Sequence, residues 1–226
     1  MKSALRVLVM FSALVVAQVA EANLIVNGGF EQPEVAHNSW KWFSSSQVDG
    51  WQGSNLEIWD HYNGFTAAEG QQHAELNAHA GSGGAFSIFQ TFETEIGAVY
   101  DLSFFYAARS SNDEAFRLNL TSGAQDIFNQ LFDDHLVRQW RQFSMTFTAI
   151  AQSTTLRFTS VAPYAGTVGN FLDNVVVLKQ PLSPLTGPQQ PQRAQPAQVP
   201  EPAGILLTAL GLLFVASGRM FVSRCK

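Results

Sequence analysis

The chain has 226 residues, a formal net charge of -5 and a single cysteine, Cys225. This acidic balance, without a basic patch, argues against a nucleic-acid partner. One cysteine excludes an intramolecular disulfide, so any folded region has to be stabilised by its core or by bound ions.

The N-terminus has the three parts of an export signal. A positively charged start leads into an apolar stretch over residues 7–19, and small residues follow at the two positions that signal peptidase reads, Ala20 and Ala22. We therefore predict a signal-peptide helix over residues 1–22, cleavage by signal peptidase and an exported mature chain that begins at Asn23.

The next part of the chain alternates between apolar and polar residues, with frequent turn residues between the alternating runs. This period of two predicts half-buried antiparallel strands, and no run has the spacing of an amphipathic helix. The predicted strands lie around residues 86–94, 101–106, 116–121, 142–148, 154–159 and 170–178. Eighteen phenylalanines are enough to fill the space between two sheets. We predict an all-β domain over residues 23–180, a single sandwich of jelly-roll type.

Four segments carry a family resemblance: residues 23–31, Asp49-Gly50-Trp51, Ala74-Glu75-Leu76 and residues 171–177. They resemble the opening strand, internal turns and closing strand of galactose-binding-like sandwiches. That group includes calcium-bearing carbohydrate-binding modules and a plant cell-wall family described as of unknown function. The resemblance implies this fold and places the first and last strands side by side.

The same resemblance implies a structural calcium ion. In such sandwiches a carboxylate from the first strand and one from the last commonly hold the ion, and Glu31 and Asp173 occupy those positions. Calcium takes six to eight oxygen ligands, so backbone carbonyls and the Asn23 or Glu75 side chain would have to contribute. The alternative is that Glu31 is solvated and Asp173 caps a turn.

Aromatic residues beside amide and charged groups are the candidates for a glycan site, because sugar rings present apolar C–H faces and hydroxyl groups. Trp40 and Trp42 are two residues apart, so an extended segment places both rings on one side. A strand end and a polar loop supply the remaining candidates. These are Trp59, Tyr62, Asn63 and Arg109. We expect Trp51 and Trp140 to lie in the core.

The stretch from His73 to His79 invites an enzymatic interpretation. His73, Glu75, Asn77 and His79 would share one face of a strand, but the two histidines would be about 20 Å apart, too far to bind one ion. An outward polar face, serving as the floor of a groove, is the expected arrangement. The sequence contains no motif for nucleophilic or phosphate chemistry. A glycosidase would need two facing carboxylates, for example among Asp60, Glu69, Asp113 and Asp126.

The composition changes after residue 180. Seven of the nine prolines fall between Pro181 and Pro202, with glutamines among them. This predicts a stiff, solvated linker over residues 181–198. It holds the folded domain away from whatever the C-terminus is attached to.

The C-terminus combines a short motif, an apolar segment and a basic end. The motif is Val199, Pro200, Glu201 and Pro202. The uncharged residues 203–218 would form a helix only about 24 Å long, shorter than the ~30 Å bilayer interior. We therefore predict a transmembrane helix over residues 203–222. The basic end places the C-terminus in the cytoplasm. Residues 199–226 resemble the PEP-CTERM sorting signal read by exosortases. An unprocessed membrane anchor is the alternative.

The leading hypothesis is a noncatalytic exported protein of the cell envelope or extracellular matrix, sorted by an exosortase, whose sandwich binds polysaccharide. This agrees with the association of PEP-CTERM proteins with exopolysaccharide and biofilm production. It would be anchored by the C-terminal helix or released after processing. A structural matrix protein that binds other proteins is the second hypothesis, and a carbohydrate-active hydrolase is the third.

Overall fold

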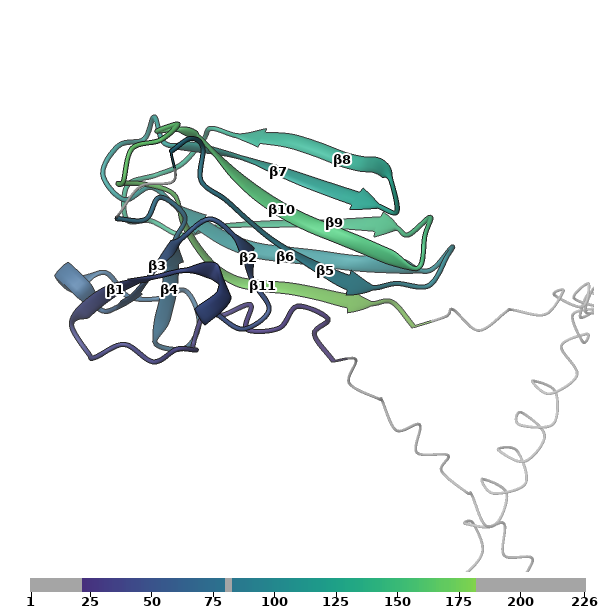
Figure 1. Cartoon of the computed structure of the whole chain (residues 1–226), viewed down its shortest axis with the longest axis horizontal. Helices are drawn as coiled ribbons and strands as arrows, with labels where there is room; N and C mark the ends of the chain where they lie inside the picture. Colours follow the sequence, from purple (N-terminus) through teal and green to yellow (C-terminus); the bar gives the residue numbers. More distant parts are fainter. Residues whose placement is uncertain (1–21, 80–82, 182–226) are drawn as a thin grey trace, which may run out of the picture. The chain divides into compact units, whose positions relative to one another are not determined.

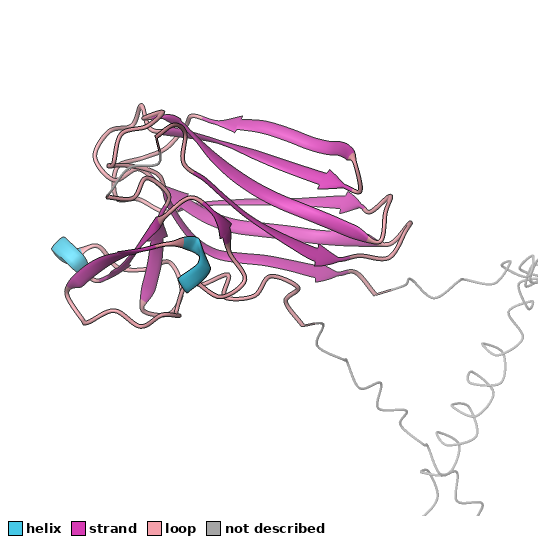
Figure 2. Ribbon diagram, in the orientation of Figure 1, coloured by secondary structure: helices cyan, strands magenta, loops and turns pink. Residues whose placement is uncertain are grey.

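Two antiparallel sheets packed face to face form the structure (Figures 1 and 2). The computed structural model describes residues 22–79 and 83–181. The six-stranded sheet has the order β1-β3-β4-β11-β6-β9 and the five-stranded sheet the order β2-β5-β10-β7-β8. The strands are β1 Ser39–Phe43, β2 Gln52–Gly53, β3 Leu56–Asp60, β4 Gln72–Glu75, β5 Ser87–Glu93, β6 Val99–Ala107, β7 Ala115–Ser122, β8 Gln125–Phe132, β9 Arg141–Thr148, β10 Ser153–Ala162 and β11 Phe171–Lys179. The predicted all-β sandwich is confirmed.

All of these strands belong to one compact unit that ends at Pro181. Within the described residues the only helices are two short 3-10 turns, η1 Ser45–Gln47 and η2 Tyr62–Gly64, and none is long and apolar enough to span a membrane. The predictions for residues 1–21, for the linker beyond Pro181, for the Val-Pro-Glu-Pro motif and for the helix over residues 203–222 lie outside the described residues.

The core lies between the sheets and is largely aromatic. Alternate residues of β6 point inward, and among them Phe104 is fully buried. Its ring centroid lies 5.1 Å from that of Phe158, 5.5 Å from that of Phe132 and 6.0 Å from that of Phe116. Each buried phenylalanine contributes about 2 kcal/mol through apolar burial. The predicted filling of the space between the sheets by phenylalanine is therefore observed.

The first predicted strand is not a strand. Residues 23–31 form turns because Asn27 and Phe30 adopt left-handed backbone angles, with φ of 51° and 54°. The segment nevertheless runs beside β11, with bonds from the Leu24 N–H to the Val177 oxygen and from the Val175 N–H to the Gly28 oxygen, each 2.9 Å. A side chain at Gly28 would collide with the Val175 oxygen, which explains the glycine.

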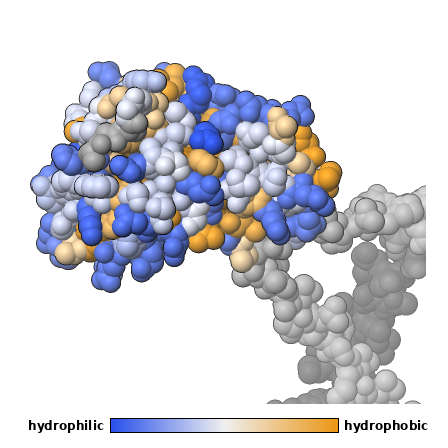
Figure 3. Space-filling model, viewed as in Figure 1, coloured by the Kyte–Doolittle hydropathy of each residue, from blue (hydrophilic) through white to orange (hydrophobic). Residues whose placement is uncertain are grey.

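The short strands β1, β3 and β4 gather at one end of the molecule, on the left in Figure 1, together with both 3-10 turns. The long strands β5 to β11 extend away from this end. On the face drawn in Figure 3 the hydrophobic residues form small scattered groups among hydrophilic ones. The candidate site is built at the end with the short strands.

Candidate functional site

The outer face of the six-stranded sheet carries a second hydrophobic cluster, separate from the core. Strand alternation sends Ile58 and Leu172 into the core and turns Trp59 and Phe171 to the opposite face. We call this second group the aromatic cluster. It comprises Trp59, Phe65, Ala107 and Phe171, with Trp40, Tyr62 and Trp140 packed against them. An antiparallel sheet usually leaves its outer face to solvent, so this covering layer is unusual.

The rings of the aromatic cluster pack in close stacked and edge-on pairs. Phe65 stacks between Trp140 and Phe171, with centroid distances of 5.1 and 5.3 Å. Trp59 meets Phe171 and Tyr62 edge to face at 5.1 and 5.0 Å. The indole N–H of Trp140 donates to the Thr66 oxygen at 2.9 Å and so fixes the loop after η2. The cluster is therefore a closely packed layer.

Two buried carboxylates face each other on this side of the sheet. Glu57 on β3 is paired with Glu75 on β4, and they are 2% and 0% exposed. Glu57 accepts the indole N–H of Trp59 at 3.0 Å and the backbone N–H of His79 at 2.5 Å. Glu75 accepts two bonds from Nη1 of Arg109, at 2.9 and 2.8 Å. Each carboxylate thus has a structural partner.

Arg109 joins the charged pair to the aromatic cluster. Its guanidinium carbon lies 4.7 Å from the centre of the Trp59 ring, a cation–π contact. Burial, together with the neighbouring Glu57, raises the pKa of Glu75 well above its usual value, while Arg109 and the Gly169 N–H partly offset the rise. The guanidinium is therefore the group that compensates the charge of a carboxylate removed from water.

The loop that carries Arg109 is held by one further carboxylate. Glu114 accepts the backbone N–H groups of Arg109, Ser110, Ser111 and Asn170 at 2.7 to 3.0 Å. Glu114 is only 3% exposed. The polar loop noted in the sequence is therefore an ordered turn that positions Arg109.

The solvent-accessible part of the site is a group of rings and polar side chains that we call the aromatic surface. Trp40 and Trp42 lie on one face of β1, as predicted, opposite Trp59 and Glu57 of β3. Trp42 is 41% exposed, and Trp40 is half-buried. Tyr62, Asn63 and His79 complete the surface, with ring contacts from Trp40 to Tyr62 at 6.4 Å and from Trp40 to His79 at 6.1 Å.

Two of the predicted glycan-binding residues, Trp59 and Arg109, are not free to contact a sugar. Trp59 is 1% exposed and lies under Tyr62 and Arg109, so its ring has no free face for a sugar. The Arg109 side chain is 25% exposed and is occupied by Glu75. Both residues instead pack beneath the exposed residues of the aromatic surface. The expectation for the core tryptophans holds for Trp51, which is 2% exposed, whereas Trp140 is half-buried in the aromatic cluster.

The polar stretch from His73 to His79 is not an outward face. Strand β4 ends at Glu75, and His73, Glu75 and Asn77 are all fully buried because the aromatic cluster and the loop over residues 163–170 cover them. His73 is surrounded by Phe171, Phe65, Trp140 and Trp59, with ring centroids 4.8 to 6.0 Å away. Neither ring nitrogen of His73 has a hydrogen-bond partner in the described part of the chain. The imidazole is therefore a neutral packing group.

This burial gives His73 a measurable effect on stability. Burial lowers the pKa of His73 from 6.5 to about 3. As the pH falls through this range, the unfolded chain takes up a proton that the folded chain does not. We expect the free energy of unfolding to fall by about 1.4 kcal/mol per pH unit for this group alone. Replacing His73 with phenylalanine removes this contribution.

Urea denaturation of the wild type and His73→Phe at neutral pH and at pH 5 measures the difference. Since all other titrating groups are common to both proteins, the stability gap should shift in favour of the variant as the pH falls. The same gap at both pH values would contradict the buried neutral assignment.

Glu31 and Asp173 converge on one loop. Asp173 accepts the N–H groups of Ala68 and Glu69 at 2.7 and 3.0 Å, and Glu31 accepts those of Gln71 and Gln72 at 2.8 and 3.1 Å. The other expected oxygen donors are engaged elsewhere. Glu75 binds Arg109, and the Asn23 side chain bonds to residues 25, 175 and 177. Two carboxylates therefore approach the 68–72 loop, and further calcium ligands would have to be backbone oxygens or water.

Several hollows lie outside the aromatic surface. One of about 390 Å³ lies between β6 and β9, lined by Asp101, Leu102, Ser103, Gln142, Ser144, Met145 and Thr146. A larger one of about 510 Å³ is lined by Leu24, Glu93, Thr94, Glu95, Tyr100, Gln152 and Lys179. The larger hollow is formed at strand ends, and its only aromatic ring, Tyr100, is 1% exposed. Volume alone therefore does not single it out as a sugar site.

Several residues of the site were not predicted. Glu57 lies two residues before the predicted Trp59 on β3 and shares its face, a signal that was available in the sequence. Phe65 and His79 lie in loops without a repeating pattern, and only the folded chain brings them to the site. A group formed by His37, Asp60 and His61 was also missed, since His37 lies 23 residues before Asp60 and only the fold brings it there.

Comparisons with known proteins give one family match and several solved structures of low similarity. A family model described as “Protein of unknown function (DUF642)” matches residues 23–178. No curated protein matches the chain. Among solved structures, TmCBM61 in complex with β-1,4-galactotriose is 14% identical with a TM-score of 0.46, covering 70% of this chain and 99% of that one. The N-terminal cellulose-binding domain of Cellulomonas fimi β-1,4-glucanase C is 20% identical with a TM-score of 0.42, covering 71% and 99%. At these scores the similarity says nothing about what this chain binds.

Proposed function

The chain belongs to the family described as “Protein of unknown function (DUF642)”, and we propose that its sandwich is a noncatalytic module that binds polysaccharide on the aromatic surface. The observation that carries this proposal is the placement of Trp40 and Trp42. Both lie on one outward face of β1, and Trp42 keeps 41% of its surface exposed. A soluble domain gains no core stability from a large ring left in water.

The chemistry of the surface suits a sugar chain. Pyranose rings have apolar C–H faces that pack on indole rings, and their hydroxyl groups need donors and acceptors at the edge. Asn63 is exposed beside Tyr62, and His79 is exposed beside Trp40. Arg138 donates to the Asn63 backbone oxygen at 2.9 Å and steadies this loop. Preorganised rings reduce the entropy lost on binding.

The same outer face continues beyond the aromatic rings. On β6 and β9 several outward residues are polar, and Ser103, Ser144 and Thr146 among them line the hollow of about 390 Å³. A surface with rings at one end and hydroxyl and amide groups along the sheet favours an extended chain over a single sugar. We therefore propose a polysaccharide as the ligand class.

The carboxylates near the rings argue for binding without hydrolysis. A glycosidase needs an acid and a nucleophile or base that reach the scissile bond and water. Glu57 and Glu75 are a facing pair beside the aromatic cluster, but they are 2% and 0% exposed, and both are held by structural partners. A substrate cannot reach either carboxylate, so this pair supports the site without acting on the glycan.

We further propose that the protein is exported and sorted by an exosortase. The signal peptide over residues 1–22 and the Val199-Pro200-Glu201-Pro202 motif, apolar segment and basic end support this part of the proposal. Signal peptidase, exosortase and the membrane are then its processing partners. A matrix role beside exopolysaccharide, anchored or released, follows from the same tail.

We also propose that Glu31 and Asp173 contribute to a structural calcium site. Carboxylate oxygens suit calcium, and these two hold the same 68–72 loop from opposite ends. Adding calcium to chelator-treated protein should then raise the melting temperature. A ligand at one hundred times its Kd stabilises by about 2.7 kcal/mol. Asp173→Asn should remove the response, and exposed Asp113→Asn should keep it. A wild-type melting temperature that calcium leaves unchanged would exclude the site.

A glycan-array screen of the full chain, purified in detergent with calcium present, tests the proposed function. Reproducible binding to one polysaccharide class would support the module. A clean blank from folded protein, judged by its cooperative melting, would contradict it and favour the protein-associating role in a matrix.

A further inference from the structure

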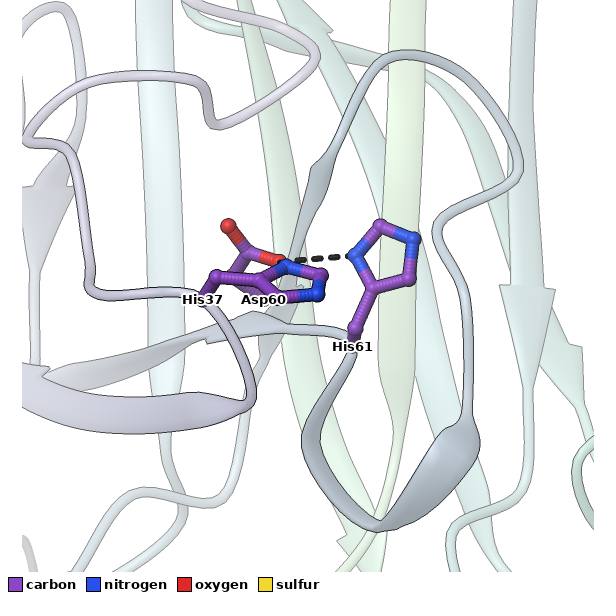
Figure 4. Close-up of side chains that lie close together, drawn as sticks. All are labelled: His37, Asp60 and His61. Carbon is purple, nitrogen blue, oxygen red and sulfur yellow. Dashed lines mark hydrogen bonds and ion pairs between the residues drawn. The ribbon is translucent and has the colours of Figure 1, made fainter.

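Two imidazoles and a carboxylate come together at the end of β3 (Figure 4). The Nδ1 atom of His37 lies 2.9 Å from Oδ1 of Asp60, and the Nδ1 atom of His61 lies 2.7 Å from the same oxygen. The three ligand atoms lie within 4.8 Å of one another. Across residues 22–79 and 83–181 this is the only set of three such side chains with that spacing.

The three residues are positioned by different parts of the fold. Asp60 is the last residue of β3 and is 4% exposed. His61 follows it, and His37 precedes β1, the edge strand paired with β3. The His61 and His37 side chains are 31% and 64% exposed. A fixed, buried carboxylate therefore faces two imidazoles that solvent can reach.

The donor set has the chemistry of a transition-metal site. Imidazole nitrogen suits zinc, copper and nickel, and a carboxylate oxygen is a common third ligand. Around tetrahedral zinc the ligand atoms are about 3.3 Å apart, given bond lengths of about 2.0 Å. The two observed separations from the Asp60 oxygen are only about half an ångström shorter. Small movements of the exposed imidazole rings would lengthen the two nitrogen–oxygen separations to that value.

We propose that His37, Asp60 and His61 bind one divalent transition-metal ion of the zinc class. Two Nδ1 atoms and one Asp60 oxygen are the ligands, and the fourth position is open to solvent. Asp60 also lines a polar hollow of about 160 Å³ with Glu31, Gln32, Glu34, Gln71 and Gln72. The ion's open position is thus accessible to water or to a small oxygen ligand.

Such an ion would join the loop before β1 to the end of β3. This link lies at one end of the β1–β3 pair, which carries Trp40 and Trp42. It would take the place of a disulfide, which a chain with one cysteine cannot form. The alternative is a purely hydrogen-bonded group, in which the Asp60 oxygen accepts an N–H from each imidazole.

Zinc calorimetry on the full chain distinguishes the metal site from the purely hydrogen-bonded group. The protein is purified with a histidine-free tag, stripped of metal with chelator and carries Cys225→Ser to remove the one thiolate ligand. We expect one zinc ion per chain with a Kd near or below about 1 μM. His37→Ala and His61→Ala should each weaken zinc binding at least about tenfold. The exposed His79→Ala is the matched control and should bind zinc like the parent.

Cobalt provides a second readout, because a three-ligand site gives a visible absorption band that hexa-aqua cobalt lacks at the same intensity. The band should appear in the parent and in His79→Ala and be lost in His37→Ala. Since the His37 side chain is 64% exposed, its removal leaves the metal-free melting temperature unchanged within about 2 °C. Absent zinc binding in the parent, or equal affinity in the His37→Ala/His61→Ala double variant, would overturn the proposal and leave the hydrogen-bonded group.

Discussion

Replacing Trp42 with alanine is expected to lower the affinity of the chain for the proposed polysaccharide ligand by about thirtyfold. The Trp42 ring is the most exposed large aromatic group on the outer face of β1, at 41%. Its removal takes away the face on which a sugar ring packs, a loss of about 2 kcal/mol. Because Trp42 lies outside both hydrophobic clusters, the fold should persist. Calorimetric titration with the polysaccharide found in the array screen measures the change.

Two controls separate loss of the ring from loss of structure. Trp42→Phe keeps an apolar ring and should retain most of the affinity. Phe89→Ala truncates a half-buried aromatic residue on β5, in the other sheet, where Arg157 lies over the ring at 4.0 Å. Its affinity should match that of the wild type. If Trp42→Ala binds as tightly as the wild type, the aromatic surface is not the sugar site.

Replacing Arg109 with methionine is expected to destabilise the chain by about 3 to 5 kcal/mol at neutral pH. The substitution keeps much of the aliphatic bulk but leaves Glu75, which is 0% exposed, without its counter-ion. Because burial and Glu57 already raise the pKa of Glu75, its folded form favours protonation. A raised pKa gives stability that is present at acid pH and lost as the pH rises. The deficit of the variant should therefore be largest at neutral and alkaline pH.

A double-mutant cycle tests the origin of this effect. Glu75→Gln in the Arg109→Met background removes the unpaired charge and should recover a large part of the lost stability. Urea denaturation of the four proteins gives the coupling energy between the two side chains. Additive single and double substitutions would show that Arg109 acts through its packing on Trp59 and not through Glu75.

The main strands could be predicted because apolar and polar residues alternate along most of their length. Phe104 and Tyr106 on β6, and Phe143 and Met145 on β9, point inward where the alternation indicates. The segment over residues 23–31 was expected to open the first strand but turns, because Asn27 and Phe30 adopt left-handed backbone angles. Strand β8 was missed because an edge strand with mostly exposed side chains has little hydrophobic pattern.

The candidate site was predicted only in part, for a related reason. Alternation tells which face of a strand a residue occupies, so Trp40 and Trp42 were correctly placed on one side of β1. It does not tell what covers that side. Phe65 and Trp140 come from loops distant in sequence, and their packing turns His73 into a buried residue. Convergence of this kind depends on the whole topology.

The position of β11 has a mechanical consequence. This strand begins at Phe171 in the aromatic cluster and ends at Lys179, where the sandwich gives way to the C-terminal segment. It lies inside the six-stranded sheet, between β4 and β6. A pull on residue 181, opposed by a ligand held at the aromatic surface, would act along the strand and load its bonds to β6 together in shear. Strands loaded in this direction separate only when many hydrogen bonds break at once, so we expect the fold to resist a pull along β11 better than a pull across it.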